Sequence, residues 1–381
     1  MQISNATALG GIRKHMHDIL RNIDSQQFKQ SYACTNLVFD TTFAHEIVEI
    51  KKQIFKVLLL PIKRKPSLTD ITNLLRLIKY IKKEQVDIVH GHGAKGGLYA
   101  RLLSVNCGVK AIYTPHGGTI HSMYNPLINK TYLLIEKVLL RFTDYLLFES
   151  QYSATMFYKK VGDFRHLSRV NYNGIAPPDI EYIKRKSISL GYVTAPHDEL
   201  QLGLFGVLRK EKGQIYAIKA VAELKQQSKI VHLHVFGKGD EQNRLEKLAI
   251  KLGVKEQVTF HGEVVGVEPH IYAMDIILIP SLFESLGYIA LEAISLKKWV
   301  IASNLGGLPE VIDHGVNGFL IKERNASEIA KAILSIADPV LKKKKISNGL
   351  NQQKFGLEQM IANIEQVYSW MMAKNEIFYL H

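Results

Sequence analysis

The chain has 381 residues, 46% of them hydrophobic and 22% charged, which is an ordinary globular composition with enough material for two domains. No apolar run approaches the roughly 18 residues of a membrane span, the N-terminus lacks the order of a signal peptide, and Cys34 and Cys107 make no disulfide framework, so we expect a cytoplasmic protein. A formal net charge of +14 favours anionic partners, but no helix-turn-helix, zinc-finger or RNA-recognition pattern supports a nucleic-acid partner.

Strand-like apolar runs alternate with helix-like stretches along most of the sequence. Residues 1–4 read as the end of a short first strand, which a Gly10-Gly11 turn follows. Further strands are expected at 86–90, 111–114, 145–149, 202–205, 232–236, 258–260, 276–279 and 300–302. Helices are expected at 68–84, 215–226, 243–252, 326–336 and 357–372. The alternation occurs twice, so it predicts two parallel sheets with helices on both faces, joined by a hinge at 173–195 that contains Asn-Gly and Pro-Pro.

The segment from 51 to 83 is both basic and apolar. The expected helix 68–84 combines an apolar stripe with four cations, namely Arg76, Lys79, Lys82 and Lys83. A core-facing helix with a solvated face explains this pattern, and so does contact with an anionic membrane surface. Both interpretations stay open at this point.

Residues 281–292, SLFESLGYIALE, carry the strongest functional signal. They follow the apolar run 276–280, which is typical of a buried parallel strand, and they lead into residues that favour a helix. Open α/β sheets bind ligands at the carboxyl ends of their strands, and a helix N-terminus attracts anions. Glu284 and Glu292 flank this turn and can accept hydrogen bonds from sugar hydroxyls. Such a pair of carboxylates is by itself usually solvated and is weak evidence, but with the surrounding strand, turn and helix the segment predicts a site for a nucleotide-diphospho-sugar.

Other loops place cations or glycines after expected strands. Residues 204–213 read LFGVLRKEKG, where Arg209 and Lys212 can hold a diphosphate or form a solvated basic loop. The Gly10-Gly11 turn permits close approach of the backbone to a phosphate and is equally explained as a tight turn. At Gly237 a simple glycine turn is the favoured explanation, and Gly306-Gly307 lets backbone N–H groups face a ligand.

Histidines gather at the ends of two expected strands: His90 and His92, then His116 and His121. Their spacing matches no zinc motif and no cysteine lies near them in the sequence, so we expect no metal site. His116, in TPHGG, stands where a strand gives way to a glycine loop. A hydrogen bond to a substrate is the favoured role for it.

The motifs occur in an order that resembles a known family. The second half of the chain contains GKGDEQNRLEKLAIKLGVKEQVTFHGEV, SLFESLGYIALEA and SNLGGLPEVIDHGVNGFLI. The first half contains GGIRKH, DIVHGHGAKGG, YTPHGG and YNGI. This ordered set is similar to that of the group 1, or family four, retaining glycosyltransferases of GT-B fold. The resemblance covers nearly the whole chain and is densest over 202–321.

The resemblance implies an α/β protein of two Rossmann-like domains that face each other across a cleft. The acceptor-side domain would comprise residues 1–175, joined by the C-terminal helix 357–381 that crosses back to it. The nucleotide-sugar-binding domain would comprise residues 176–356.

The resemblance also implies roles for individual residues. Glu284 would hold hydroxyls of the donor sugar and Glu292 the nucleotide ribose. Lys212 would stabilise the departing diphosphate, and His116 would face the reacting sugar. The other donor-binding positions would be Arg209, Gly11, Gly237, Ser285, Leu286, Gly287 and Tyr288. Neither a metal nor a cofactor would be required, since the nucleotide-sugar is a substrate.

Three features depart from the family pattern. Val207 stands where the family often has arginine, and Arg209 is the candidate to replace it. Lys297, Lys298 and Trp299 replace the usual Gly-x-Pro, so the preceding helix lacks a glycine cap. The first strand is also short.

These observations predict a retaining glycosyltransferase that moves a sugar from a nucleotide-diphospho-sugar, with UDP favoured, to a hydroxyl of a glycan or lipid-linked acceptor in cell-surface polysaccharide synthesis. An anionic membrane surface is a further candidate partner, and nucleic acid is not expected. A nucleotide-sugar epimerase of the same fold and a non-catalytic nucleotide-sugar-binding protein remain alternatives. A glycoside hydrolase would also use two carboxylates but would leave the phosphate-type loops unexplained.

Overall fold

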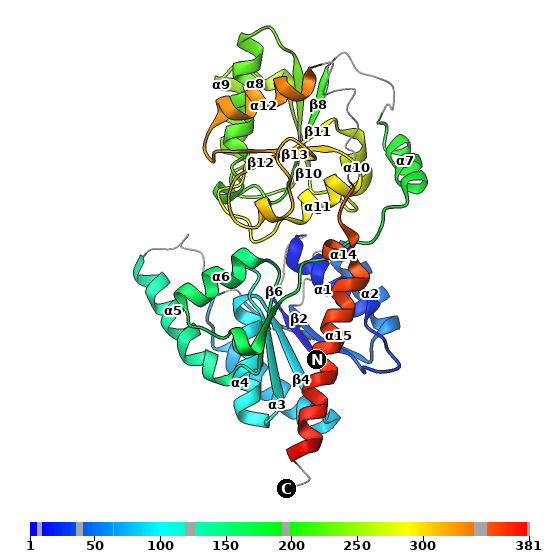
Figure 1. Ribbon diagram of the computed structural model, residues 1–381, viewed down its shortest axis with the longest axis vertical. Helices are drawn as coiled ribbons and strands as arrows, with labels where there is room; N and C mark the ends of the chain where they lie inside the picture. The colour runs from blue at the N-terminus through cyan, green and yellow to red at the C-terminus, as the bar shows by residue number, and fades with distance from the viewer. Residues whose placement is uncertain are drawn as a thin grey trace. The chain divides into compact units, whose positions relative to one another are not determined.

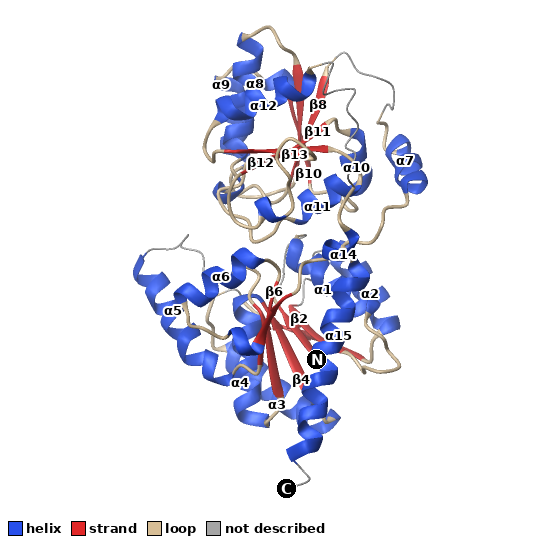
Figure 2. Ribbon diagram, viewed as in Figure 1, coloured by secondary structure: helices blue, strands red, loops and turns tan. Residues whose placement is uncertain are grey.

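The computed structural model describes residues 1–5, 10–35, 41–63, 65–118, 126–192, 199–338 and 349–378. The chain divides into two compact units: unit 1, Met1–Gly174 with Leu357–His381, and unit 2, Ile175–Gly356. Each unit is built on a parallel sheet that helices cover on both faces (Figure 1, Figure 2). This confirms the α/β fold of two Rossmann-like domains.

Unit 1 has a sheet in the order β3-β2-β1-β4-β5-β6-β7, and its described pairings are parallel. The strands are β1 (Gln2–Ser4), β2 (Ser31–Thr35), β3 (Lys56–Leu60), β4 (Ile88–His92), β5 (Lys110–Thr114), β6 (Tyr145–Phe148) and β7 (Ser168–Val170). The longer helices are α1 (Gly11–Asn22), α2 (Thr41–Gln53), α3 (Thr69–Glu84), α4 (Gly93–Cys107), α5 (Pro126–Leu139), α6 (Gln151–Lys160) and α15 (Leu357–Phe378). The strand order reverses between β1 and β4, which is where such sheets bind ligands.

The core of unit 1 lies on both faces of this sheet because side chains alternate along each strand. Ala33 of β2 packs with apolar residues of α3 and α4. Its neighbours Tyr32 and Cys34 pack instead with α1 and α2. Every residue of β4 is buried, as expected for a strand covered on both faces.

Helix α15 packs on unit 1, although it follows unit 2 in the sequence. Its buried apolar residues are Met360, Ile361, Ile364, Val367, Tyr368 and Met371, which lie against Ile19, Ile23, Ile88, Ile112 and Leu147. The expected return of the last helix to the first domain is therefore confirmed. Among the described residues, no helix combines the length and apolar character that crossing a membrane requires.

Unit 2 has a sheet in the order β10-β9-β8-β11-β12-β13 with parallel pairings. The strands are β8 (Leu200–Phe205), β9 (Val231–Phe236), β10 (Val258–Gly262), β11 (Ile276–Ile279), β12 (Trp299–Ser303) and β13 (Gly318–Ile321). The helices include α7 (Ile180–Ser189), α8 (Gln214–Gln226), α9 (Gln242–Lys251), α10 (Glu268–Ala273), α11 (Tyr288–Ser295), α12 (Ala326–Ala337) and α14 (Gln352–Phe355). Here the strand order reverses between β8 and β11.

Two local predictions differ from the structure in part. The strand expected at 86–90 runs from Ile88 to His92, because Val86 still donates its N–H to the Ile81 carbonyl at the end of α3. The expected hinge at 173–195 does contain the boundary between the two units, at Gly174 and Ile175. It also contains helix α7, which was not expected and which Asp179 caps by accepting a hydrogen bond from the Tyr182 N–H. The Pro-Pro pair therefore precedes a helix and does not mark a continuous linker. The short first strand is confirmed as β1.

Candidate functional site

Three loops of unit 2 meet at the carboxyl ends of β8, β11 and β12, which are adjacent in the sheet. The loop after β8 is joined to the loop after β11 by a hydrogen bond from the Leu282 N–H to the Glu211 carbonyl, 2.7 Å long. The reversal of strand order between β8 and β11 places this meeting point where open α/β sheets accept ligands.

Gly213 allows the first two loops to pack together. It follows the short 3-10 turn Lys210–Lys212 and has a φ of 66°, in the left-handed region. A Cβ atom added at this position would lie 1.9 Å from the carbonyl oxygen of Pro280. Only glycine satisfies both the conformation and the space.

Lys212 and Glu284 form an ion pair at this point, with the Lys212 ammonium donating to Glu284 Oε1. The hydroxyl of Ser281 donates to the same carboxylate oxygen at 3.1 Å. The Lys212 side chain is 34% exposed and that of Glu284 is 15% exposed, so both groups are partly desolvated and still accessible. The arrangement presents a cation and a carboxylate side by side at the sheet edge.

The loop after β12 packs on the backbone of Glu284. The Gly307 N–H donates to the Glu284 carbonyl at 3.2 Å. Gly306 has a φ of 63°, and a Cβ there would lie 1.9 Å from the same carbonyl oxygen. The loop after β11 is thus held from both neighbouring strands, which fixes the position of the Glu284 carboxylate.

Helix α11 begins directly after this loop, at Tyr288, and its N-cap is Gly287 with a φ of 98°. The helix N-terminus adds the positive end of its dipole to the charge of Lys212. Glu292 lies one turn further along α11 and is 5% exposed. Glu284 therefore belongs to the loop and Glu292 to the helix, while Ser285, Leu286 and Gly287 form the turn between them.

The remaining unit 2 candidates differ in surroundings. Arg209 precedes the turn that carries Lys212 and is exposed. Gly237, after β9, donates its N–H to the Gly262 carbonyl at 2.6 Å. A Cβ at Gly237 would lie 2.0 Å from the carbonyl oxygen of Gly206. This close approach between two loops explains the glycine at 237 without any ligand.

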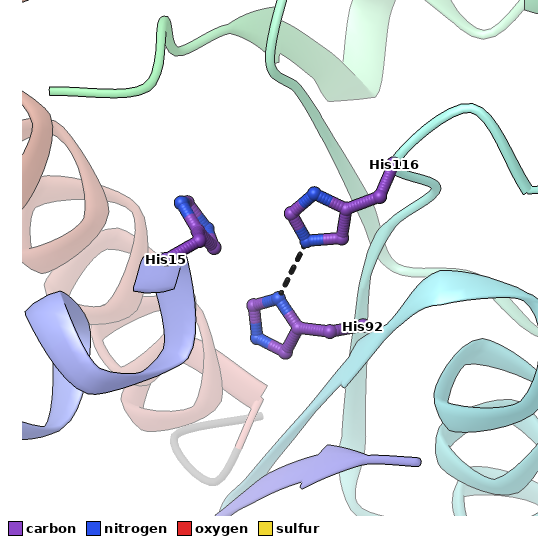
Figure 3. A group of neighbouring side chains, drawn as sticks. All are labelled: His15, His92 and His116. Carbon is purple, nitrogen blue, oxygen red and sulfur yellow. Dashed lines mark hydrogen bonds between the residues drawn. The ribbon is translucent and has the colours of Figure 1, made fainter. Parts of the chain in front are cut away.

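In unit 1, three histidines meet near the reversal between β1 and β4. His15 comes from α1, His92 ends β4, and His116 follows β5 with a φ of 49° (Figure 3). One ring nitrogen of each lies within 4.8 Å of the others. His92 Nδ1 and His116 Nε2 are 3.2 Å apart. His121 lies outside the described residues, and Gly11 is the exposed first residue of α1, one turn before His15.

A chain of buried hydrogen bonds fixes the proton on His92. The Gln2 amide donates to the Tyr368 hydroxyl at 2.8 Å, so Gln2 Oε1 is the atom that accepts from His92 Nε2 at 3.0 Å. With its proton on Nε2, His92 presents a lone pair at Nδ1, and His116 Nε2 donates to it. The Tyr368 hydroxyl donates in turn to His90 Nδ1 at 2.7 Å, and His90 Nε2 donates to Thr114 at 2.8 Å.

Burial keeps these histidines neutral. Desolvation lowers the pKa of His15 to about 4, and it places the pKa values of His90, His92 and His116 well below the ordinary value. Neutral rings at neutral pH retain one acceptor nitrogen each, which can bind a hydroxyl proton or a metal ion.

The structure brings together two groups of predicted residues. Lys212, Glu284 and the 285–288 turn meet in unit 2, and His92 and His116 meet in unit 1. No individual role was predicted from the sequence for His15, Gln2, Ser281 or Tyr368. Of these, only His15 carried a usable signal, because it lies one helical turn after the Gly10-Gly11 turn.

The fold is that of the GT-B type glycosyltransferases. The family model described as "Glycosyl transferases group 1" matches residues 193–351, and "Glycosyltransferase Family 4" matches residues 9–177. The chain belongs to this family of glycosyltransferases, as the motif order predicted.

Individual relatives support the same assignment. EpsD of Bacillus subtilis (strain 168), which is named as a glycosyltransferase, is 30% identical to this chain over 291 residues. The match covers 72% of this chain and 74% of the EpsD chain. The uncharacterized glycosyltransferase MJ1607 of Methanocaldococcus jannaschii is 35% identical over 167 residues, 42% of this chain and 43% of its own. Anabaena HepE, crystallised with UDP and glucose, has a TM-score of 0.80 at 21% identity and covers 97% of this chain and 98% of its own.

Proposed function

We propose that the protein is a retaining glycosyltransferase that transfers a sugar from a UDP-sugar to a hydroxyl of a glycan or lipid-linked acceptor in cell-surface polysaccharide synthesis. The observation that carries the proposal is the Lys212–Glu284 pair at the β8/β11 reversal, beside the N-terminus of α11. A donor of this class needs positive charge for its diphosphate and hydrogen-bond acceptors for its sugar hydroxyls. Both are present side by side at this place.

In the proposed complex Lys212 and Glu284 each bind a different part of the donor. The Lys212 ammonium and the α11 N-terminus stabilise the diphosphate. The Glu284 carboxylate accepts hydrogen bonds from sugar hydroxyls, and Glu292 takes the ribose hydroxyls. Gly11 and His116 take the roles that the resemblance implies, at the phosphates and the reacting sugar.

The comparisons support the choice of UDP, which the sequence already favours. HepE was crystallised with UDP-glucose and with UDP and glucose. Its sequence is 21% identical to this chain, so the likeness supports the fold and makes UDP the first nucleotide to test.

The proposed reaction retains the anomeric configuration by front-face attack. The bond between the anomeric carbon and the diphosphate oxygen breaks, and its electron pair goes to the diphosphate. The acceptor oxygen bonds to the anomeric carbon on the same face, and its proton passes to the leaving phosphate oxygen. Lys212 and the helix dipole stabilise the charge that grows on the diphosphate, which is the electrostatic contribution expected of such a site. On this proposal no cofactor and no metal is needed for transfer.

The proposed acceptor lies at the cytoplasmic face of a membrane, and exposed apolar side chains on α3 and α5 support this part. On α3, Ile71 and Leu75 are 59% and 62% exposed, next to Arg76 and Lys79. On α5, Leu127 and Leu134 are 73% and 63% exposed, and the nearby Lys130 and Lys137 are also exposed. A helix that exposes both apolar and cationic side chains suits contact with an anionic bilayer.

The donor proposal is tested with a panel of nucleotide-sugars. A UDP-sugar is expected to raise the melting temperature and to be hydrolysed slowly to UDP when no acceptor is present. Proton NMR of the first product formed should show the anomeric configuration of the donor. Conversion of the donor to an isomer without release of UDP would identify an epimerase, and binding with neither outcome a non-catalytic binding protein. If no nucleotide-sugar binds, the proposal is wrong.

The membrane proposal is tested by flotation with vesicles of neutral or anionic phospholipid. The protein is expected to float with anionic vesicles and to be released by high salt, since exposed charges are screened. Equal behaviour with both kinds of vesicle would contradict it. A variant with Leu127 and Leu134 replaced by serine should float less.

A further inference from the structure

We propose that His15, His92 and His116 form a binding site for a divalent transition-metal ion of the zinc class. A second step rests on the proposed function: an ion bound here would engage His116 and compete with the sugar donor, so it would inhibit transfer. The ion is a ligand that transfer does not require.

The spacing of the three rings suits such an ion. The 3.2 Å between His92 Nδ1 and His116 Nε2 is close to the separation of about 3.3 Å that two nitrogens adopt on a tetrahedral zinc ion. The nitrogens of the three rings lie within 4.8 Å of one another, so closing around an ion requires a shift of roughly 1.5 Å at most. The rings point toward one another from three separate elements (Figure 3).

The groups behind two of these rings also suit metal binding. A histidine that binds a metal usually donates its other ring N–H to a fixed acceptor. Gln2 Oε1 already accepts the outer N–H of His92, so Nδ1, which accepts from His116 Nε2 when no ion is bound, is the nitrogen whose lone pair an ion would take. The Asn173 side chain interacts with His15, and its buried Oδ1 has no donor among the described residues. Asn173 is therefore the candidate to accept an N–H of His15 when the other ring nitrogen binds an ion.

The chemistry of the donor set selects the ion. Three neutral imidazoles favour zinc, cobalt, nickel and copper over magnesium or calcium, which prefer oxygen ligands. His15 is 3% exposed and His92 is 0% exposed, whereas His116 is partly buried, so an ion can reach the site from the His116 side.

On binding, the proton that His116 Nε2 shares with His92 moves to His116 Nδ1, so no net proton is released. Three protein ligands leave a fourth coordination position open.

The test is titration of the untagged, full-length protein with Zn²⁺ by calorimetry and with Co²⁺ by visible absorption. One ion per chain is expected, with the intense absorption bands of tetrahedral cobalt. His15→Gln and His92→Gln should each weaken binding at least tenfold. The matched control is His261→Gln in unit 2, where His234 Nδ1 and His261 Nε2 are 2.8 Å apart, and it should leave the titration unchanged.

Thermal unfolding of each variant in the absence of metal shows whether it has folded. Failure of the wild-type protein to bind zinc or cobalt, or loss of binding only in His261→Gln, would overturn the metal site.

The second step is tested by enzyme kinetics, where zinc should raise the KM for the donor and leave kcat unchanged. Zinc binding without competition would remove the second step only. Zinc binding by a protein that takes no nucleotide-sugar would refute the proposed function and leave the metal site standing.

Discussion

Lys212 and Glu284 lie 72 positions apart in the sequence and form an ion pair at the boundary between β8 and β11. The pair exists because the strand order reverses there, so the loops that follow β8 and β11 become neighbours. The Ser281 hydroxyl holds the same carboxylate oxygen, which fixes its position before any ligand arrives.

Replacing Lys212 by alanine is expected to lower kcat with the donor on the order of 10²-fold, because the growing charge on the diphosphate loses its cation. Glu284→Gln should lower kcat/KM, since an amide accepts fewer hydroxyl hydrogen bonds. Lys210→Ala is the matched control, because Lys210 lies on the same 3-10 turn and is exposed. Steady-state kinetics would contradict the assignment if Lys212→Ala and Lys210→Ala behaved alike.

Gly213→Ala is expected to unfold the donor-side loops or destabilise the protein by about 3 kcal/mol or more, because the added Cβ meets the Pro280 carbonyl. The control is Gly253→Ala, whose φ of 68° matches the 66° of Gly213 but whose Cβ would meet no atom within 4 Å. That variant carries only the left-handed strain of about 1 kcal/mol. Urea unfolding of both variants separates steric overlap from strain, and equal losses would show that the packing against Pro280 is unimportant.

Lys297→Gly is expected to stabilise the protein by about 0.5–1 kcal/mol. After α11, Lys298 N–H donates to the Ala293 carbonyl and Lys297 N–H to that of Ile294, both at 2.9 Å, which is a Schellman motif. Lys297 has a φ of 57° at the position where glycine is preferred, as the departure from Gly-x-Pro predicted. Lys247→Gly, at an exposed position inside α9, should change the unfolding free energy in the opposite direction. Chemical denaturation measures both changes.

The two thiols should differ in reactivity. Burial raises the pKa of Cys34 to about 12, so the reactive thiolate is scarce at pH 8 and labelling should stay slow until the pH approaches that value. Cys107 is only partly buried, so it should be the residue that iodoacetamide modifies first. Mass spectrometry of the native protein at pH 8 should find label on Cys107, and Cys107→Ser should remove it. Rapid labelling of Cys34 in the folded protein would contradict its burial.

The sequence carried enough information for most of the architecture, because the signals were local. The run Ile276–Ile279 is buried throughout and forms β11, and the residues after Gly287 form α11, as expected. Strands β2, β3, β7 and β13 were not predicted. β3 is partly exposed at the sheet edge and so lacks a continuous apolar pattern. Helix α7 was missed because its N-cap Asp179 follows a Pro-Pro pair that also marks loops.

Long-range pairings could not be predicted from patterns along the chain. Lys212 meets Glu284 only because β11 pairs with β8 rather than with β10. His15 joins His92 and His116 only because β1 lies beside β4, which sets α1 near the ends of β4 and β5. Sequence order gives each loop its residues, whereas strand order decides which loops meet.

Tyr368→Phe is expected to reduce both stability and turnover. The Tyr368 hydroxyl, on α15, accepts from Gln2 and donates to His90, and all three side chains are buried. Removing it leaves a buried amide donor and a buried ring nitrogen without partners, which should lower the free energy of unfolding by about 2 kcal/mol.

The same variant should also affect the proposed site. Without the hydroxyl, the side-chain amide of Gln2 can flip and present its NH₂ group to His92. The proton of His92 is then no longer fixed on Nε2. His116 then loses its ordered partner, so kcat should fall while the KM for the donor changes little. Tyr80→Phe is the matched control. The Tyr80 hydroxyl forms a 2.7 Å hydrogen bond with Ser31 in a partly buried position, where water can replace the lost hydroxyl as a hydrogen-bond partner. Equal losses of stability in the two variants, or an unchanged kcat in Tyr368→Phe, would show that α15 supports the fold of unit 1 without ordering His116.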